Sequence, residues 1–360
     1  MQEAIYKKFD WPLLMVTLIL SGISIATFYL IDPSYNEIIT RQIVLVSIGI
    51  LAFIGFSFFD YRIFKNNSLP SILFYVITVG LLLLTLTSPE IRGARAWTTV
   101  LGLRFEPSEI AKLAVLILLA KYFSQKHVEI YRTPHILASG IYAGIPAVIT
   151  FLQSDLGSMI VFIALWLGML TFSGINKKHL LAILMIGVVL ASLAWFVVLQ
   201  DYQKQRLASF IDPYLDPLES GYSTIQAKTT LGSGMLMGTL LGGREDSALI
   251  TVPEPHTDFA FAALAQKFGF IGVIAVLGLL GFLLLRIGSI TIGANNNFAK
   301  LYGLGLMMII FIHIIINVGM NLGVMPITGI PLPFLSYGGS HLITLMIGLG
   351  LIQSIKMRAS

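Results

Sequence analysis

The polar stretch at residues 249–261 has the residue types and the position of a reactive site. It reads LITVPEPHTDFAF and joins a long polar segment to a long apolar run. Pro253 and Pro255 restrict the backbone shortly before Asp258, so this carboxylate is presented at the start of the apolar run. A carboxylate at such a place could accept a proton from a substrate. It could equally do no more than cap a helix that begins at Phe259, because aspartate satisfies free helix N–H groups.

Glu109 and Lys112 form a second candidate site. They stand three positions apart at the start of another apolar run, so on a helix they share one face and can pair. Ionisable groups at membrane depth are costly and usually face a polar cavity, which favours a functional role for the pair. A structural salt bridge beside a helix cap at Ser108 explains the same residues, and the two interpretations are compatible.

Asp155 and Arg206 are less specific candidates. Asp155 lies in the very short turn 153–157 between two apolar runs, where it either caps the following helix or lines a cavity. Arg206 follows Lys204 in the long polar segment, and a basic pair at a membrane surface usually contacts solvent or lipid head groups. A role of Arg206 in substrate binding therefore needs support from outside this pattern.

The segment 88–107 is unusual for its charge. Its basic residues are Arg92, Arg95 and Arg104. Lysine and arginine concentrate in cytoplasmic loops of membrane proteins, whereas this segment falls outside the cell if the N-terminus is cytoplasmic. Such an exception indicates a partner for the arginines, which is either a phosphate group or one of the glutamates in and beside the segment.

The histidines do not form a recognisable metal-binding motif. His256 and Asp258 are two positions apart and His313 lies in a distant apolar run, so the sequence does not indicate a tight zinc site. A loosely held Mg²⁺ or Mn²⁺, bound through one or two carboxylates and a substrate phosphate, is a candidate cofactor with Asp258 as a possible ligand. Neither a dinucleotide fingerprint nor a Walker motif is present, so no organic cofactor is expected.

The composition is that of an integral membrane protein. Of 360 residues, 56% are hydrophobic and only 11% are charged, against about 25% charged in soluble domains. The basic residues are dispersed between apolar runs rather than gathered in a stripe, so no nucleic-acid partner is expected. The absence of cysteine excludes disulfides, thiolate metal sites and cysteine nucleophiles.

Ten apolar runs approach the length of about 20 residues that a helix needs to cross a bilayer. The fourth run is short and contains Lys112, and the fifth contains Pro146, so these two are the least regular. The sequence predicts an all-α integral membrane protein, one polytopic membrane domain over residues 1–360, with a large extracytoplasmic loop at 200–257 between the seventh and eighth helices. The ten runs are 11–31, 42–59, 70–87, 108–123, 136–153, 156–173, 179–199, 258–286, 298–322 and 337–356.

The basic residues beside these runs favour a cytoplasmic N-terminus. Ten crossings then return the C-terminus to the cytoplasmic side. The expected location is a cytoplasmic membrane, with residues 249–261 at its outer face.

Four ordered stretches resemble the signature motifs of the SEDS family (shape, elongation, division and sporulation). The resemblance covers essentially the whole chain, including ten spans and one large loop. The short termini are more similar to the elongation members of the family than to its division members. The four stretches are FEPSEIAK at 105–112, QSDLG at 153–157, PEPHTDF at 253–259 and PLPFLSYGG at 331–339.

The resemblance implies a peptidoglycan glycosyltransferase in the bacterial inner membrane. Its substrates would be lipid II, the undecaprenyl-linked disaccharide peptide, and the undecaprenyl-linked glycan strand that it extends. In the family the aspartate of the H-T-D-F motif is essential, which here is Asp258, and the glutamate and lysine of the P-S-E motif correspond to Glu109 and Lys112. Glu254 and Arg206 also match family positions, and His256 precedes the essential aspartate.

The sequence departs from the family pattern at two places. Gln266 and Lys267 replace an acidic pair that many members carry before Phe-Gly, so a role of that pair is not expected here. His341 stands where a serine commonly follows Tyr-Gly-Gly-Ser.

The chemistry of such a transferase agrees with the residues. Asp258 would serve as the base for the acceptor hydroxyl in a single inverting displacement, while Lys112, Arg206 and the arginines near Arg95 would stabilise the leaving pyrophosphate. The expected protein partners are a class B penicillin-binding protein, which is a transpeptidase, and membrane proteins of the elongation complex. A lipid II flippase and a non-catalytic scaffold for a transpeptidase are the alternatives, although transporter charges usually lie near the midplane between repeats.

Overall fold

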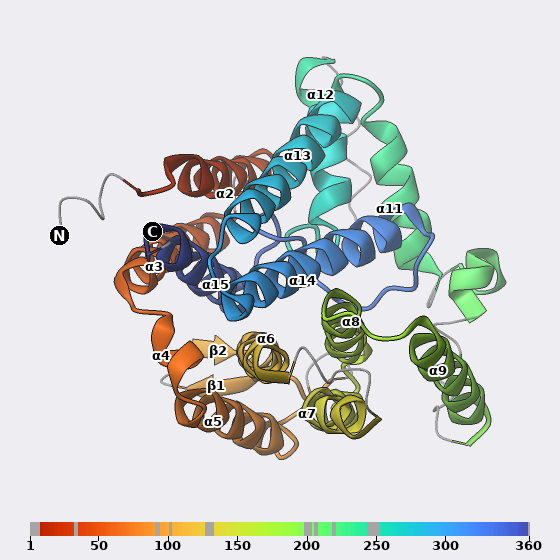
Figure 1. Ribbon diagram of the computed structural model, residues 1–360. Helices are drawn as coiled ribbons and strands as arrows, with labels where there is room; N and C mark the ends of the chain where they lie inside the picture. Colours follow the sequence, from red (N-terminus) through yellow and green to blue (C-terminus); the bar gives the residue numbers. More distant parts are fainter. Residues whose placement is uncertain are drawn as a thin grey trace.

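The computed structural model describes residues 8–31, 35–90, 94–100, 103–126, 133–197, 204, 208–217, 221–242 and 253–358. Within these ranges the protein is a bundle of ten long helices with one small hairpin (Figure 1). The long helices are α2 (Trp11–Ile31), α3 (Asn36–Phe58), α5 (Leu69–Thr85), α6 (Pro107–Lys126), α7 (Thr133–Leu152), α8 (Leu156–Phe172), α9 (Lys177–Val197), α13 (Ala260–Ile292), α14 (Asn297–Leu322) and α15 (Gly339–Arg358).

A long helix occupies each of the ten predicted apolar runs. Seven of them are long and apolar enough to cross a membrane, namely α2, α3, α7, α9, α13, α14 and α15. Helices α5 and α8 are apolar but have only 17 residues each. Helix α6 has the length but carries four charged residues, which lower its hydropathy. The chain is therefore an all-helical, multi-pass membrane protein.

Helix α6 lies at the centre of the bundle. Residues 111–120 are all buried, and the helix packs against α5, α7, α8, α14 and α15. Because neighbouring helices surround it, α6 can carry charged side chains that would be costly against lipid. Neighbouring helices thus shield Lys112, which made this run look irregular in the sequence, from lipid.

Two short strands precede α6. Strands β1 (Thr98–Val100) and β2 (Leu103–Phe105) pair antiparallel, with Thr98 opposite Phe105. The apolar-run analysis did not predict this hairpin, because three-residue strands produce no detectable alternation. The hairpin leads the arginine-containing segment directly into the first turn of α6.

The described helices between α9 and α13 pack against the bundle. This part of the chain contains the 3-10 turn η1 (Pro213–Leu215), α11 (Tyr222–Ser233) and α12 (Gly238–Leu241). Helix α11 contacts α13 and α14, and α12 contacts α13. The contact with α13 falls at a kink, where Gly269 has φ +66° and a Cβ atom would lie 2.3 Å from the Gly238 nitrogen. Only glycine fits this approach of two backbones.

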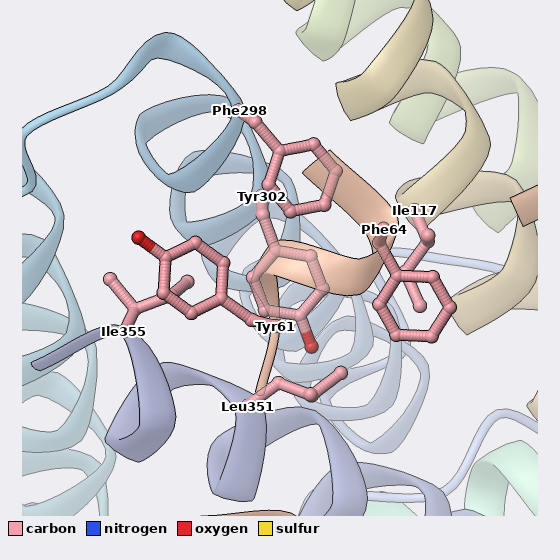
Figure 2. Close-up of a pocket in the computed structure, with 7 residues that line it drawn as sticks. All are labelled: Tyr61, Phe64, Ile117, Phe298, Tyr302, Leu351 and Ile355. Carbon is pink, nitrogen blue, oxygen red and sulfur yellow. The ribbon is translucent and has the colours of Figure 1, made fainter. Parts of the chain in front are cut away.

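The start of α2 and the end of α15 lie at one end of the bundle, which we call the termini end (Figure 1). The fully buried carboxylate of Asp10 binds Arg286 at 2.8 Å and also Lys356, and Arg62 donates to the carbonyl of Arg358. An apolar hollow near this end carries no charged side chain (Figure 2). Its lining residues are Tyr61, Phe64, Ile117, Phe298, Tyr302, Leu351 and Ile355.

Candidate active site

The four predicted motif stretches meet at the opposite end of the bundle, which we call the site end. It is formed by the first residues of α6, α8, α13 and α15 and the last turns of α14. The contacts that join the stretches are Ser158 Oγ to Ser108 Oγ at 3.2 Å, His341 Nδ1 to Glu109 Oε2 at 2.9 Å, and the N–H of Tyr337 to the carbonyl of His256 at 2.7 Å.

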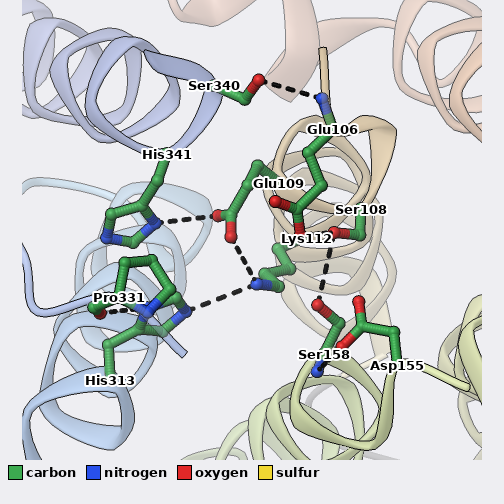
Figure 3. A network of polar contacts seen from close by, with 10 residues as sticks. All are labelled: Glu106, Ser108, Glu109, Lys112, Asp155, Ser158, His313, Pro331, Ser340 and His341. Atoms are coloured by element: carbon green, nitrogen blue, oxygen red, sulfur yellow. Dashed lines mark hydrogen bonds and ion pairs between the residues drawn. The ribbon is translucent and has the colours of Figure 1, made fainter. Parts of the chain in front are cut away.

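Glu109 and Lys112 form the predicted ion pair, and it is almost completely buried. Lys112 Nζ lies 2.9 Å from Glu109 Oε1, and the two side chains are 2% and 3% exposed. The second carboxylate oxygen accepts a hydrogen bond from His341 Nδ1 (Figure 3). Both oxygens of Glu109 therefore have a donor, as a charge in a low-dielectric interior requires.

His313 completes this cluster on the other side of Lys112. Its Nε2 atom lies 3.5 Å from Lys112 Nζ, and its Nδ1 atom lies 3.3 Å from the carbonyl of Pro331. An ammonium group only donates, so Nε2 accepts and Nδ1 carries the proton toward Pro331. The His313 and His341 rings stack with centroids 4.4 Å apart and an angle of 11°.

The cluster also brings together possible metal ligands. Among the described residues, Glu109, His313 and His341 have donor atoms within 4.8 Å of one another. The ammonium of Lys112 already supplies the positive charge there, and parallel stacked imidazoles do not direct their lone pairs at one ion. The donor set also differs from the oxygen ligands that Mg²⁺ prefers. We therefore do not assign the predicted divalent ion to this cluster.

Asp155 caps α8, as one of its two sequence interpretations predicted. Its Oδ1 accepts the N–H of Ser158 at 2.9 Å. Figure 3 shows Asp155 beside the Ser158 and Ser108 pair, across α6 from the histidines. Ser108 in turn donates to Glu106 Oε1 at 2.8 Å. The cap and the first turn of α6 thus belong to one polar network.

Three carboxyl groups lie close together at the site end, those of Glu106, Glu109 and Asp155. Burial, together with the charges of Glu109 and Asp155, raises the pKa of Glu106 to about 8. Burial also raises the pKa of Asp155 above its ordinary value. The neighbouring carboxylates thus favour the protonated form of Glu106 beside the buried ion pair.

Asp258 is half-buried and lies two residues before the start of α13 at Ala260. The cap position of α13 is Phe259, whose side chain makes no capping hydrogen bond. The capping oxygen comes from another helix, because Asn321 Oδ1 accepts the N–H of Ala262 at 3.1 Å. The helix-cap interpretation placed the cap at Asp258, one residue before the observed cap position Phe259.

Glu254 and His256 lie in the same turn as Asp258. Glu254 has φ +51°, a left-handed conformation that is uncommon for residues other than glycine. Its Oε2 lies 3.5 Å from His256 Nε2, and both side chains are partly exposed. The His256 ring contacts the edges or faces of Tyr35 and Tyr337, with centroids 5.9 and 6.0 Å away.

Of the four arginines that the sequence singles out, the structure describes only Arg95 and Arg104. Arg95 Nη2 lies 3.9 Å from Glu90 Oε2, with both side chains more than half exposed, and its N–H donates to the carbonyl of Gln153 at 2.9 Å. The main chain of Arg104 belongs to β2. Arg92 and Arg206 lie outside the described residues, as do residues 200–203, 205–207, 218–220 and 243–252 of the predicted large loop.

Sequence reasoning missed three residues of the site end. Asn317 and Asn321 are fully buried and contact the main chain of Asp258, and His341 contacts Glu109. Two asparagines four residues apart in an apolar run are a detectable signal, because polar groups at membrane depth are usually functional. His341 was noted only as a departure from a family pattern, since its partner lies 232 positions away.

The chain matches a family described as cell cycle protein, with the FtsW, RodA and SpoVE proteins as its members, over residues 7–360. It is 36% identical to peptidoglycan glycosyltransferase MrdB of Escherichia coli (strain K12) over 267 residues, which are 73% of this chain and 71% of MrdB. It is 32% identical to stage V sporulation protein E of Bacillus subtilis (strain 168), with 96% of each chain covered.

Solved structures are similar over nearly the full length. A chain from a peptidoglycan synthase complex that coordinates polymerization and crosslinking superimposes with a TM-score of 0.85 at 29% identity, covering 98% of each chain. The crystal structure of the rod shape determining protein RodA of Thermus thermophilus gives a TM-score of 0.71 at 28% identity, covering 97% of this chain and 96% of that one.

The buried cluster allows a direct test of its role in stability. Glu109→Ala leaves Lys112 without its counter-charge and His341 Nδ1 without its acceptor in a low-dielectric site, and we expect it to cost about 3–5 kcal/mol. The matched control is Glu37→Ala, which breaks the exposed pair with Arg41 and should cost about 1 kcal/mol or less. Unfolding measurements in detergent give both values. Equal losses in the two variants would show that the Glu109 cluster is not a buried, mutually dependent network.

Proposed function

This chain belongs to the FtsW, RodA and SpoVE family and is a peptidoglycan glycosyltransferase, and we propose that it polymerises lipid II with Asp258 as the general base. The observation that carries the proposal is the connection between Asp258 and the buried charge cluster through α14. His313 contacts Lys112, and Asn317, one helical turn later, contacts the carbonyl of Asp258. Asp258, the proposed base, and Lys112, the proposed electrostatic group, are thus both contacted by the last turns of α14.

The reaction joins two lipid-linked sugars. The acceptor hydroxyl transfers its proton to the Asp258 carboxylate, and the acceptor oxygen forms a bond with the anomeric carbon of the donor. The bond between that carbon and the pyrophosphate oxygen breaks, and the pyrophosphate leaves with the bonding electrons. A single displacement inverts the α-linked donor to a β-linked product without a covalent enzyme intermediate.

Two kinds of positive charge would stabilise the leaving pyrophosphate. Lys112 is almost fully buried, so in this arrangement it acts through its field rather than by direct contact. Arg95 is more than half exposed at the site end and can reach a substrate phosphate, with Arg206 as a further candidate from the large loop. Asp155, Glu254 and His256 would line the substrate site around these groups.

We assign the divalent ion to the carboxylates near Asp258. Glu254 and Asp258 offer oxygen ligands, and Mg²⁺ or Mn²⁺ commonly binds one or two carboxylates together with a substrate phosphate. When bound, the ion would supply charge neutralisation for the pyrophosphate. The nitrogen-rich cluster at Glu109 does not offer this chemistry.

The proposed topology has ten crossings, with α5, α6 and α8 spanning the bilayer as part of the packed bundle. The helices around α6 shield its charged side chains from lipid. Its mean hydropathy therefore underestimates its ability to span the bilayer. The termini end, where Arg286, Lys356 and Arg358 gather, would face the cytoplasm. The site end and the 200–257 loop would then face outward, where lipid II presents its head group.

The proposed protein partner is a class B penicillin-binding protein, acting within an elongation complex. The support is the similarity to a chain of a peptidoglycan synthase complex. Helix α9 presents an apolar surface with no buried residue in its spanning window, so it has room for lipid or for a partner's transmembrane helix. Partner binding would select one arrangement of the loop that ends at Asp258.

Asp258→Asn tests the proposed base. The variant keeps the shape of the side chain but cannot accept the proton, so polymerisation of labelled lipid II should fall by about 10²- to 10⁴-fold. The matched control is Asp60→Asn, at the termini end beside Arg358, which should retain nearly full activity. Activity near wild type in Asp258→Asn would remove this carboxylate from the mechanism.

Chelation tests the divalent ion. After dialysis against EDTA, we expect polymerisation to be largely lost and to return on addition of Mg²⁺ or Mn²⁺, because uncompensated pyrophosphate charge slows its departure. The helical content, followed by circular dichroism, should not change. Undiminished activity of the chelated protein would exclude a role for the ion.

The transpeptidase partner should raise the rate of the isolated protein. We expect low turnover alone and faster turnover with the partner, accompanied by altered reaction of a cysteine introduced at the exposed Thr229 in α11 with a thiol-reactive crosslinker. Thr229 is exposed on the loop helix that packs against α13, so its environment reports the loop arrangement. Identical rates and identical crosslinks in both conditions would rule out activation through the loop.

A further inference from the structure

Two buried asparagines on α14 contact the main chain beside Asp258. Asn317 and Asn321 are both 0% exposed, and their spacing of four residues places them on one face of the helix. His313 lies one turn earlier on the same face. Polar side chains at this depth are costly unless they are fully hydrogen-bonded. The hydrogen-bond partners of each asparagine therefore indicate its structural role.

Both asparagines donate to the same acceptor, the carbonyl oxygen of Asp258. The Nδ2 atoms of Asn317 and Asn321 lie 3.2 and 3.1 Å from this oxygen. A carbonyl has two lone pairs, and two donors fix the plane of the peptide group that follows Asp258. The main-chain position from which the Asp258 side chain projects is therefore held from α14.

Asn321 also holds the first turn of α13. Its Oδ1 accepts the N–H of Ala262, three residues after the cap position Phe259. This N–H is the one that a capping side chain usually satisfies, and Phe259 has no oxygen to offer. One amide group thus caps α13 and holds Asp258 at the same time.

Asn317 links the same point to the break before α15. Its Nδ2 donates to the carbonyl of Ile330 at 2.8 Å as well as to Asp258. Asn321 Nδ2 also contacts the main-chain and side-chain oxygens of Asn317, at 2.8 and 3.3 Å. The two asparagines therefore form one unit between the segment that carries Asp258 and the segment that leads to His341.

We propose that Asn317 and Asn321 are positioning residues that orient the Asp258 carboxylate for proton transfer. The proposal rests on the role of Asp258 as the base. Aspartate or glutamate at these two positions would supply no N–H donor in the ionised form, and an apolar residue would leave the Asp258 carbonyl and the Ala262 N–H without partners. Displacement of a catalytic group by about 1 Å can reduce a rate by about 100-fold, so loss of the clamp should act on turnover.

The test compares Asn321→Ala with Asn296→Ala in the full-length protein. Asn296 caps α14 at the termini end in the same way, since its Oδ1 accepts the N–H of Ala299 at 2.9 Å, and its Nδ2 donates to the Tyr61 hydroxyl. Both changes remove a cap and a side-chain donor, but only Asn321→Ala releases Asp258. Polymerisation of labelled lipid II gives kcat and KM, and thermal unfolding in detergent gives the stability loss.

We expect Asn321→Ala to reduce kcat by about 10- to 100-fold with KM within about twofold, and Asn296→Ala to leave kcat within about twofold. Asn317→Ala keeps the Ala262 cap and should also reduce kcat, so it decides the question if Asn321→Ala does not fold. A kcat for Asn317→Ala and Asn321→Ala within twofold of the Asn296→Ala value would overturn the positioning role while leaving Asp258 as the base. Full activity of Asp258→Asn in the same assay would overturn both.

Discussion

A buried charge is stable in an apolar bundle only if its polar atoms find partners, and the Glu109–Lys112 pair shows how this chain meets that constraint. Glu109 receives one donor from its own helix and one from His341 on α15, while Lys112 reaches His313 on α14. The pair forms within α6, and two further helices supply its remaining polar partners. The central place of α6 and the arrangement of the site end both follow from this requirement.

Helix α14 connects this cluster to the proposed base. His313, Asn317 and Asn321 follow at intervals of four residues, which is about 6 Å of helix each, and together they reach from the ion pair to the main chain of Asp258. Near the other end of α14, Phe298 and Tyr302 line the apolar hollow, about 30 Å along the helix from Asn321.

The sequence was sufficient for the helices and for the residues of the four motifs, because apolar runs and short motifs are local signals. It could not show that Lys112 would be buried rather than line open space, since that depends on the helices around α6. Asn321 illustrates the same limit: an asparagine in an apolar run indicates a function but does not identify Asp258, 63 positions earlier, as its partner. The departure at His341 became meaningful only when its distance to Glu109 was known. Arg206 lies outside the described residues and remains a prediction.

The most direct test of this account is an electron cryo-microscopy structure of the Asp258→Asn protein with lipid II bound. We predict sugar density at the site end, with a hydroxyl of the acceptor within hydrogen-bond distance of the side chain at position 258. The pyrophosphate should lie on the same side of the bundle, facing Arg95 and the field of Lys112. Substrate density at the termini end, or between helices far from position 258, would contradict the central claim.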